Sequence, residues 1–282
     1  MKPSRFDYLR VQTAQEAIEA LSQTEDARIL AGGQSLMAIL NMRLAQPSLL
    51  VDISRSQELD QIRHEGTWLR VDAATTQARL EWMPDIAQQV PLLAQAFPYI
   101  SHFQIRNRGT VCGSVAHADP SAEIPLVLVA LKGEVILRGP RKRRTLTATE
   151  FFQGMLSTAK GPDEIVESVR FPKAVAGNGY AFTEYSQRHG DFAICAVAAV
   201  VNPTGIRFAV GGVADRPTAI DWPLLDSGDL DDALNDFSWE LQARDDPQVS
   251  ALARRHMVRK LGKKIIAQAS KQCHPDSVGE RR

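Results

Sequence analysis

The residues best suited to chemistry lie first in a segment centred on two adjacent glycines, Leu30-Ala31-Gly32-Gly33-Gln34-Ser35-Leu36. Paired glycines after a short apolar stretch let backbone N–H groups turn outward with no Cβ in the way. Such amides can bind a phosphate group, and the Ser35 hydroxyl can cap a following helix or bind a phosphate oxygen. Because the spacing is neither Gly-x-Gly-x-x-Gly nor a Walker loop, the segment alone indicates either a phosphate contact or a structural turn.

A second segment, residues 105–120, combines glycines with hydroxyl, cationic and carboxylate side chains: Ile-Arg-Asn-Arg-Gly-Thr-Val-Cys-Gly-Ser-Val-Ala-His-Ala-Asp-Pro. We predict a long functional loop over residues 103–119, whose backbone can lie along an extended ligand. Arg106 and Arg108 either face phosphate or form salt bridges within the protein. His117 is either a ligand or proton-transfer group, or a hydrogen-bonded loop residue.

Strands and helices must position these two segments. Thr13-Ala14-Gln15-Glu16 is a capping box that begins a helix. A strand at 28–31, a helix after the glycines and a buried strand at 49–53 predict a βαβ-like unit. Further helices are expected over residues 84–100, where the helix is broken into pieces, and over 122–131 and 249–269. A pair of short strands is expected within 62–71. Further single strands are expected over 134–137, 143–146, 165–171, 180–188, 193–201 and 207–213.

Composition limits the class of function. The 282 residues include 33 Lys and Arg and 33 Asp and Glu, a balance that argues against a nucleic-acid-binding protein. No apolar run reaches the roughly 18 residues that a membrane helix needs, and no signal-peptide core follows the first residues. We therefore expect a cytoplasmic protein, or one attached peripherally to the inner face of a membrane.

The three cysteines, Cys112, Cys195 and Cys273, are sparse and far apart. They indicate neither a disulfide framework nor an iron–sulfur or zinc ligand pair. No His/Asp partner can be placed beside Cys112, so it is not expected to be a nucleophile. Any redox metal centre that serves this protein must therefore lie in another chain.

Taken together, the segments at 31–36 and 105–120 resemble those of the FAD-binding medium subunits of the xanthine dehydrogenase family. This family includes the medium subunits of aerobic carbon monoxide dehydrogenase and of quinoline- and nicotinate-type hydroxylases. The resemblance covers nearly the whole chain and includes Phe6-Asp7-Tyr8, Val51-Asp52-Ile53, Phe151-Phe152-x-Gly154, Asp163-Glu164-Ile165, Phe171-Pro172, Arg188-His189-Gly190-Asp191 and Gly211-Gly212-Val213.

The resemblance implies an α+β chain with the two-lobed FAD-binding fold of the vanillyl-alcohol-oxidase (PCMH) type and a C-terminal α/β lobe. We expect an N-terminal FAD-binding lobe at 1–57, a second at 58–175 and the C-terminal lobe at 176–282. Matched positions would surround FAD. The pyrophosphate would be wrapped by the first segment, at Ala31, Gly32, Gly33, Gln34 and Ser35, with Leu36 beside them. The other side of the cofactor would be lined by the second segment, at Thr110, Val111, Cys112, Gly113 and Ser114, with His117 near. Ile100 would lie beside the isoalloxazine ring, Glu123 at the polar end of the cofactor and Lys160 at the flavin edge.

Two positions depart from the family pattern. Cys112 replaces the first of two glycines, and a cysteine would be strained there if the backbone needed a positive φ. We expect a conformation that tolerates the side chain. Some relatives have a lysine, which would stabilise anionic reduced flavin, where this chain has Glu184; a glutamate pointing inward would not.

The resemblance also implies a division of labour between chains. A large subunit with a molybdenum–molybdopterin cofactor would hydroxylate the substrate with water. A small subunit would carry electrons through two [2Fe–2S] clusters to FAD in this chain, and FAD would pass them to an external acceptor. We expect a dimer of heterotrimers, with no catalytic residue or metal ligand in this chain.

Two alternatives stay open from the sequence. A stand-alone flavin oxidoreductase of the same fold would need its own acid/base pair, and none is evident. A non-catalytic interaction subunit that has lost FAD is supported only by Cys112 and Glu184.

Overall fold

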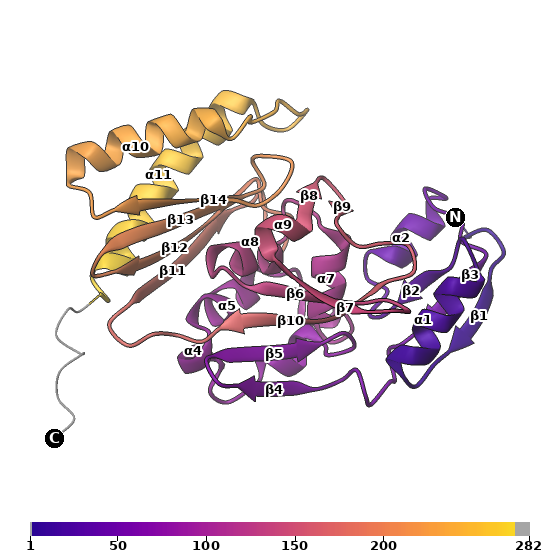
Figure 1. The fold of residues 1–282 in the computed structure, drawn as a ribbon. Coiled ribbons are helices and arrows are strands. Elements are labelled where there is room, and N and C mark those ends of the chain that lie inside the picture. Colours follow the sequence, from indigo (N-terminus) through magenta and orange to yellow (C-terminus); the bar gives the residue numbers. More distant parts are fainter. Residues whose placement is uncertain (1, 274–282) are drawn as a thin grey trace, which may run out of the picture.

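The computed structural model describes residues 2–273, which run through three main β-sheets and a small hairpin (Figure 1). The first sheet is parallel and has the order β1-β3-β2, formed by Asp7–Arg10, Leu49–Asp52 and Arg28–Leu30. Helix α1 (Ala14–Gln23) begins with the expected capping box, since Thr13 and Glu16 bond reciprocally to each other's backbone amides. Helix α2 (Leu36–Asn41) connects β2 to β3 and completes the predicted βαβ-like unit.

The second sheet is antiparallel, with the order β4-β5-β10-β6-β7. Its central strand, β10, is largely buried because helices cover the sheet. The strands are Ile62–Glu65, Trp68–Asp72, Ile165–Pro172, Glu134–Arg138 and Arg143–Thr147, in that order. The helical segments are α3 Gln77–Glu81, α4 Ile86–Gln89, α5 Pro91–Ala96, η1 Phe97–Tyr99, α6 Phe103–Arg106, α7 Val111–His117, α8 Glu123–Ala130 and α9 Ala148–Phe151, followed by the hairpin β8 Phe152–Gly154 and β9 Ser157–Thr158.

The third sheet is an antiparallel meander, β11-β12-β13-β14, formed by Gly179–Tyr185, Cys195–Asn202, Gly205–Gly211 and Thr218–Pro223. Helices α10 (Ser227–Glu240) and α11 (Ala251–Ser270) lie on one face, in orange and yellow in Figure 1. Side chains alternate along a strand. On β11, Ala181 therefore faces the core under α10 and α11, whereas Tyr180 and Phe182 join the core shared with the second sheet.

Two close approaches hold α11 to this sheet. A Cβ at Gly179 would lie 1.8 Å from the carbonyl oxygen of Ala269, so only glycine permits the observed packing. The buried Arg254 guanidinium donates to the carbonyl oxygens of Ile194, at 2.6 Å, and Gly212, at 2.5 Å. The C-terminal helix thereby fixes the ends of β12 and β13.

Candidate functional site

The first glycine segment forms an open turn between β2 and α2. Gly33 has a φ of +72°, which favours glycine. The amide N–H groups of Gly33, Gln34 and Ser35 donate no hydrogen bond within residues 2–273, and all three residues are half-buried. Ser35 lies at the N-cap position of α2, but its side chain does not cap the helix. The turn thus presents three unpaired donors, as a bound anion requires.

The second segment is helical, and the prediction of a long loop over residues 103–119 is wrong. Thr110 is the N-cap of α7, and its hydroxyl oxygen accepts from the Gly113 amide at 2.9 Å. Val111, Cys112 and Val115 are buried at helical spacing, which holds α7 against the second sheet. Small residues in this segment permit close packing of a short helix, so their composition does not indicate a flexible loop.

The two segments touch through their backbones. A Cβ on Gly32 would lie 2.2 Å from the carbonyl oxygen of Arg108 and 2.6 Å from the Gly109 Cα. The carbonyl oxygen of Gly109 accepts from the Gln77 amide at 2.8 Å. Helix α3, which begins at Gln77, therefore helps to hold this contact in place. Side chains are excluded at the junction, and the open turn lies directly beside the entry to α7.

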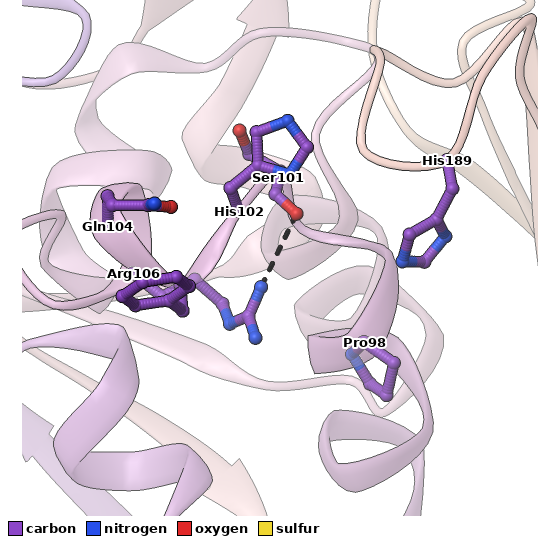
Figure 2. Close-up of a pocket in the computed structure, with 7 residues that line it drawn as sticks. Pro98, Ser101, His102, Gln104, Arg106 and His189 are labelled. Atoms are coloured by element: carbon purple, nitrogen blue, oxygen red, sulfur yellow. Dashed lines mark hydrogen bonds between the residues drawn. The ribbon is translucent and has the colours of Figure 1, made fainter.

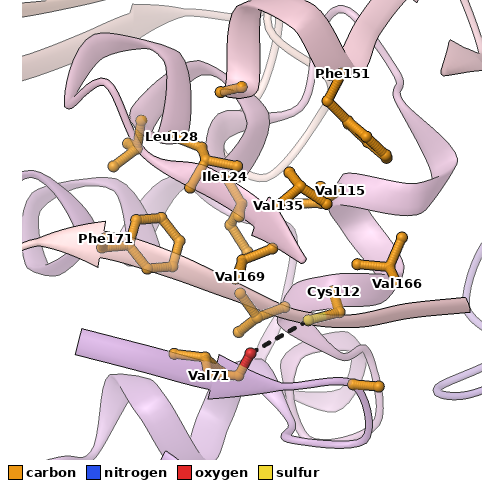
Figure 3. Close-up of a cluster of buried hydrophobic side chains, with 14 of the residues drawn as sticks. Val71, Cys112, Val115, Ile124, Leu128, Val135, Phe151, Val166, Val169 and Phe171 are labelled. Carbon is orange, nitrogen blue, oxygen red and sulfur yellow. Dashed lines mark hydrogen bonds between the residues drawn. The ribbon is translucent and has the colours of Figure 1, made fainter. Parts of the chain in front are cut away.

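Cys112 is accommodated without strain. Its φ lies outside the left-handed region, its side chain is buried among apolar neighbours, and its Sγ lies 3.4 Å from the Val71 carbonyl oxygen (Figure 3). Burial raises the pKa of the thiol far above its usual value. The expectation that this position tolerates a side chain is confirmed, and the inert thiol serves packing.

Several other positions selected from the sequence form contacts within the protein. Arg106 forms a two-point ion pair with Glu81, at 2.8 and 3.0 Å, and its Nη1 donates at 2.8 Å to the carbonyl oxygen of the buried Ile100. Salt bridging is therefore the role of Arg106. Arg108, in contrast, is exposed beside the Gly32 contact and makes no ion pair within residues 2–273.

Lys160 and His117 lie at the edge of this region. The Lys160 Nζ donates to the carbonyl oxygens of Gly161 and Glu164, at 2.7 and 3.2 Å. Burial, and secondarily the charge of Arg28 on β2, lowers the pKa of Lys160. His117 is half-buried in the last turn of α7.

Glu123 begins α8 as a buried carboxyl group with 8% exposure. Burial, followed by the nearby Asp119, raises its pKa to about 7. Glu184, which departs from the family pattern, lies on β11. Both of its carboxyl oxygens are buried without a hydrogen-bond partner among residues 2–273, and burial, then Glu123, raises its pKa to about 8.

An open pocket that the sequence did not indicate lies between the α5–α6 region and the β11–β12 loop (Figure 2). Its volume is about 490 Å³. Ser101, next to Ile100, has a φ of +42°, and a Cβ on Gly190 would approach its carbonyl oxygen to 3.0 Å. The lining residues are Pro98, Ser101, His102, Phe103, Gln104, Arg106 and His189.

Comparison with known proteins identifies the family. Residues 4–174 match the family described as the FAD binding domain in molybdopterin dehydrogenase. The chain belongs to this family. It is 38% identical, over 77% of both chains, to the nicotine 6-hydroxylase medium subunit of Paenarthrobacter nicotinovorans. It is 37% identical, over 78% of both chains, to the carbon monoxide dehydrogenase medium chain of Hydrogenophaga pseudoflava.

Solved structures show the same fold for this member of the molybdopterin dehydrogenase FAD-binding family. Carbon monoxide dehydrogenase from Hydrogenophaga pseudoflava superposes with a TM-score of 0.92 at 31% identity, covering 97% of this chain and 100% of that chain. Quinoline 2-oxidoreductase from Pseudomonas putida 86 gives a TM-score of 0.90 at 30% identity, covering 97% and 100%. The expected FAD-binding fold and the oxidoreductase class are thereby confirmed.

The residues present fit FAD. The three unpaired amides of the first turn suit its pyrophosphate, and the Gly32 junction excludes side chains from the adjoining backbone. Within residues 2–273 no group of three His, Cys, Asp or Glu side chains is arranged to hold a metal ion. None of the described helices is long and apolar enough to cross a membrane.

Proposed function

We propose that this chain is the FAD-carrying electron-transfer subunit of a heterotrimeric molybdenum hydroxylase. The junction of the two glycine-centred segments carries this proposal, because it brings a turn with three unpaired amides beside a helix from another part of the family domain. When bound, FAD supplies the redox chemistry, accepting electrons and passing them on. The chain's own task is to bind FAD and adjust its potential.

The geometry supports a role for each matched position. The amides of residues 31–36 would hold the pyrophosphate, with Arg108 able to add positive charge at the junction. Residues 110–114 would support the same cofactor from the start of α7. Ile100 would supply an apolar wall beside the ring, while Glu123 would face the polar part. We assign His117 and Lys160 to the rim, since Lys160 donates to its own loop.

Partner subunits would hold the other redox centres. The relatives are named as medium subunits or medium chains, which supports a small subunit with two [2Fe–2S] clusters and a large subunit with molybdenum–molybdopterin. The buried thiols of Cys112 and Cys195 are poorly placed to bind a cluster. We further propose a dimer of heterotrimers in the cytoplasm that passes electrons to an external acceptor. Free thiols are usual in that reducing compartment.

The sheets support the proposed lobes. The first sheet lies within residues 1–57, the second within 58–175 and the third within 176–282. We propose that the first two lobes bind FAD between them and that the third covers the α5 and α8 side.

The direct test is Gly33→Asp, which places a carboxylate against the proposed pyrophosphate site. Gly66→Asp is a matched control, because Gly66 also has a positive φ, of 59°, and a Cβ there meets nothing within 4 Å. We expect the first variant to lose FAD absorbance while its circular dichroism stays native, and the control to keep both. A folded Gly33→Asp chain with full FAD content would remove this turn from the site.

Co-purification tests the assembly. The chain, isolated from its native host, should carry molybdenum and iron in its fractions together with flavin absorbance. A yellow chain that purifies alone would favour a stand-alone flavin oxidoreductase. A colourless chain that takes up no added FAD would favour a non-catalytic subunit.

A further inference from the structure

The third sheet contacts the FAD-binding half of the chain through the end of strand β13. Residues 211–216, which include this strand end, lie outside the matched family domain. The Gly212 amide donates at 2.7 Å to the carbonyl oxygen of Pro120, in the turn between α7 and α8. The Arg216 guanidinium donates at 3.2 Å to the carbonyl oxygen of Phe152 in β8, and Figure 1 shows the β8–β9 hairpin beside this end of the sheet. The C-terminal lobe therefore holds backbone atoms of the family domain.

The two glycines at this strand end allow a close approach. A Cβ on Gly211 would lie 3.2 Å from the Pro120 carbonyl oxygen and 3.3 Å from the side chain of Leu126 on α8. A Cβ on Gly212 would lie 2.6 Å from the carbonyl oxygen of Ala193. Side chains are thus excluded where β13 meets the turn, and a methyl group at Gly211 would press on the turn itself.

Arg254 holds the same strand end from the side of α11. Its buried guanidinium donates to the carbonyl oxygens of Gly212, at 2.5 Å, and Ile194, at 2.6 Å, and it forms an ion pair with Asp246. Both backbone groups of Gly212 are therefore paired, the carbonyl with Arg254 and the amide with Pro120. Removal of the guanidinium would leave two buried carbonyl groups without this donor, which is unfavourable.

The turn that receives these contacts sets where α7 ends and α8 begins. Helix α7 has only seven residues, and a helix this short depends on tertiary contacts for its stability. Its first turn is capped by the Thr110 hydroxyl. Its other end is held from outside the helix, since the Leu156 amide donates at 3.1 Å to the carbonyl oxygen of Ala118 and the contact with Gly212 follows two residues later.

We propose that Arg254 and Gly211 are positioning residues for the FAD site, which fix the turn between α7 and α8 through Gly212. The proposal rests on the proposed function, which places residues 110–114 of α7 and Glu123 of α8 at the cofactor. Neither Arg254 nor Gly211 touches FAD. A binding site must be held to within about 0.5 Å of its productive geometry, so contacts that fix the supporting elements contribute to affinity. The C-terminal lobe then serves FAD binding although it lies outside the family domain.

Gly211→Ala tests this role with a small displacement. The added methyl group would lie closer to the Pro120 carbonyl oxygen than side chains normally do, so the turn must move by a few tenths of an ångström. Gly262→Ala is a matched control, because its methyl group meets only side chains of the same lobe, at Leu234 and Phe208. We expect the dissociation constant of FAD to rise about two- to thirtyfold in the first variant and to stay native in the control. Flavin fluorescence titration of the FAD-free full-length chain measures it.

Substitution of Arg254 tests the other side of the contact. Arg254→Met removes the donor to Gly212 and Ile194, whereas Arg254→Lys keeps a positive charge and donors on a single nitrogen. We expect FAD to bind most weakly to the methionine variant, with partial rescue in the lysine variant. Arg259→Met is a matched control on the same helix, since Arg259 bonds to Asn235 of α10 at 2.7 Å, and it should bind FAD as the native chain does. If Arg254→Met does not fold, the alanine pair decides.

Thermal unfolding of each variant separates positioning from general stability. Native FAD affinity in both Gly211→Ala and Arg254→Met, together with lowered stability, would overturn the positioning role. Weakened FAD binding in the two controls as well would also overturn it, because affinity would then follow stability alone. A native full-length chain that takes up no FAD would overturn the proposed function itself.

Discussion

The two glycine-centred segments have similar composition, but they differ in how their backbone amides are paired and in how much space they leave for a side chain. In residues 31–36 the backbone amides stay unpaired, and Gly32 is fixed by backbone atoms that leave no room for a Cβ. In residues 110–114 the Thr110 hydroxyl accepts from the Gly113 amide in the first turn of α7. The side chain of Cys112 fits at the second position of this helix. Glycine is thus a steric requirement in the first segment and a replaceable residue at position 112 in the second.

Gly32→Ala should have the largest effect. The added Cβ would collide with the backbone at Arg108 and Gly109, which cannot move independently of α7. Overpacking of this kind costs about 3 kcal/mol or more when the neighbour is backbone. Urea unfolding and FAD content of the purified chain should both fall. A variant with native stability and full FAD would show that the two segments do not require this contact.

A pH-dependent difference follows from Glu123, the buried carboxyl that begins α8 just after the second segment. Residues 31–36 contain no ionisable side chain, whereas Glu123 has a folded pKa of about 7, above the ordinary 4.5. Its contribution to stability is therefore fully present below pH 4.5 and lost as the pH rises through 7. Between pH 5 and 8 the loss should be about 2–3 kcal/mol, from 1.36 kcal/mol per pKa unit.

Glu123→Gln should remove most of that pH dependence. Urea unfolding at several pH values measures it, with the exposed Glu19→Gln as control. Equal pH profiles for native and Glu123→Gln chains would contradict the assignment.

Thr110→Ala should have an intermediate effect. The substitution removes the acceptor for the Gly113 amide and leaves the start of α7 uncapped. Loss of a threonine cap costs about 1–2 kcal/mol. Thermal unfolding should report it, and Thr147→Ala, at the cap of α9, gives a comparison away from the junction. If FAD affinity fell only in the first variant, the cap would serve the cofactor as well as the helix.

Cys112→Gly should have the smallest effect. It introduces the glycine that the family resemblance implies at this position, at the cost of about 1 kcal/mol for glycine in a helix. FAD content should stay native, because the Sγ points towards Val71 and its apolar neighbours. A large gain in FAD affinity would instead mean that the cysteine disturbs the site.

Local signals predicted much of the fold. The capping box at Thr13, the buried helix α8 and the long helix α11 were identified from residue type and spacing, and each lies where expected. Strand β1 was not expected, since its four residues are exposed and show no alternation. Helix α10 was also missed, although Leu230, Leu234 and Phe237 recur on one buried face and would have indicated it.

The site was less accessible from sequence. Residues 103–119 are mostly small and polar, and this composition hid the helical spacing of the buried residues Val111, Cys112 and Val115 in α7. The packing of these residues against their buried neighbours favours the helix over a loop. The contact of Gly32 with Arg108, and the two-point ion pair of Arg106 with Glu81, join residues distant in the chain. No local pattern specifies such pairs, so they became visible only with the sheets in place.

The junction at Gly32 has a consequence for biosynthesis. The proposed anion-binding turn lies early in the chain, but the backbone that it contacts, at Arg108 and Gly109, is translated only after the hairpin β4–β5 and helices α3 to α6. If FAD binds at this junction as proposed, the nascent chain lacks a full site until these segments dock. A ligand that binds only the docked state stabilises it by mass action. FAD would then act as a late checkpoint on maturation, retaining chains whose two halves have joined correctly.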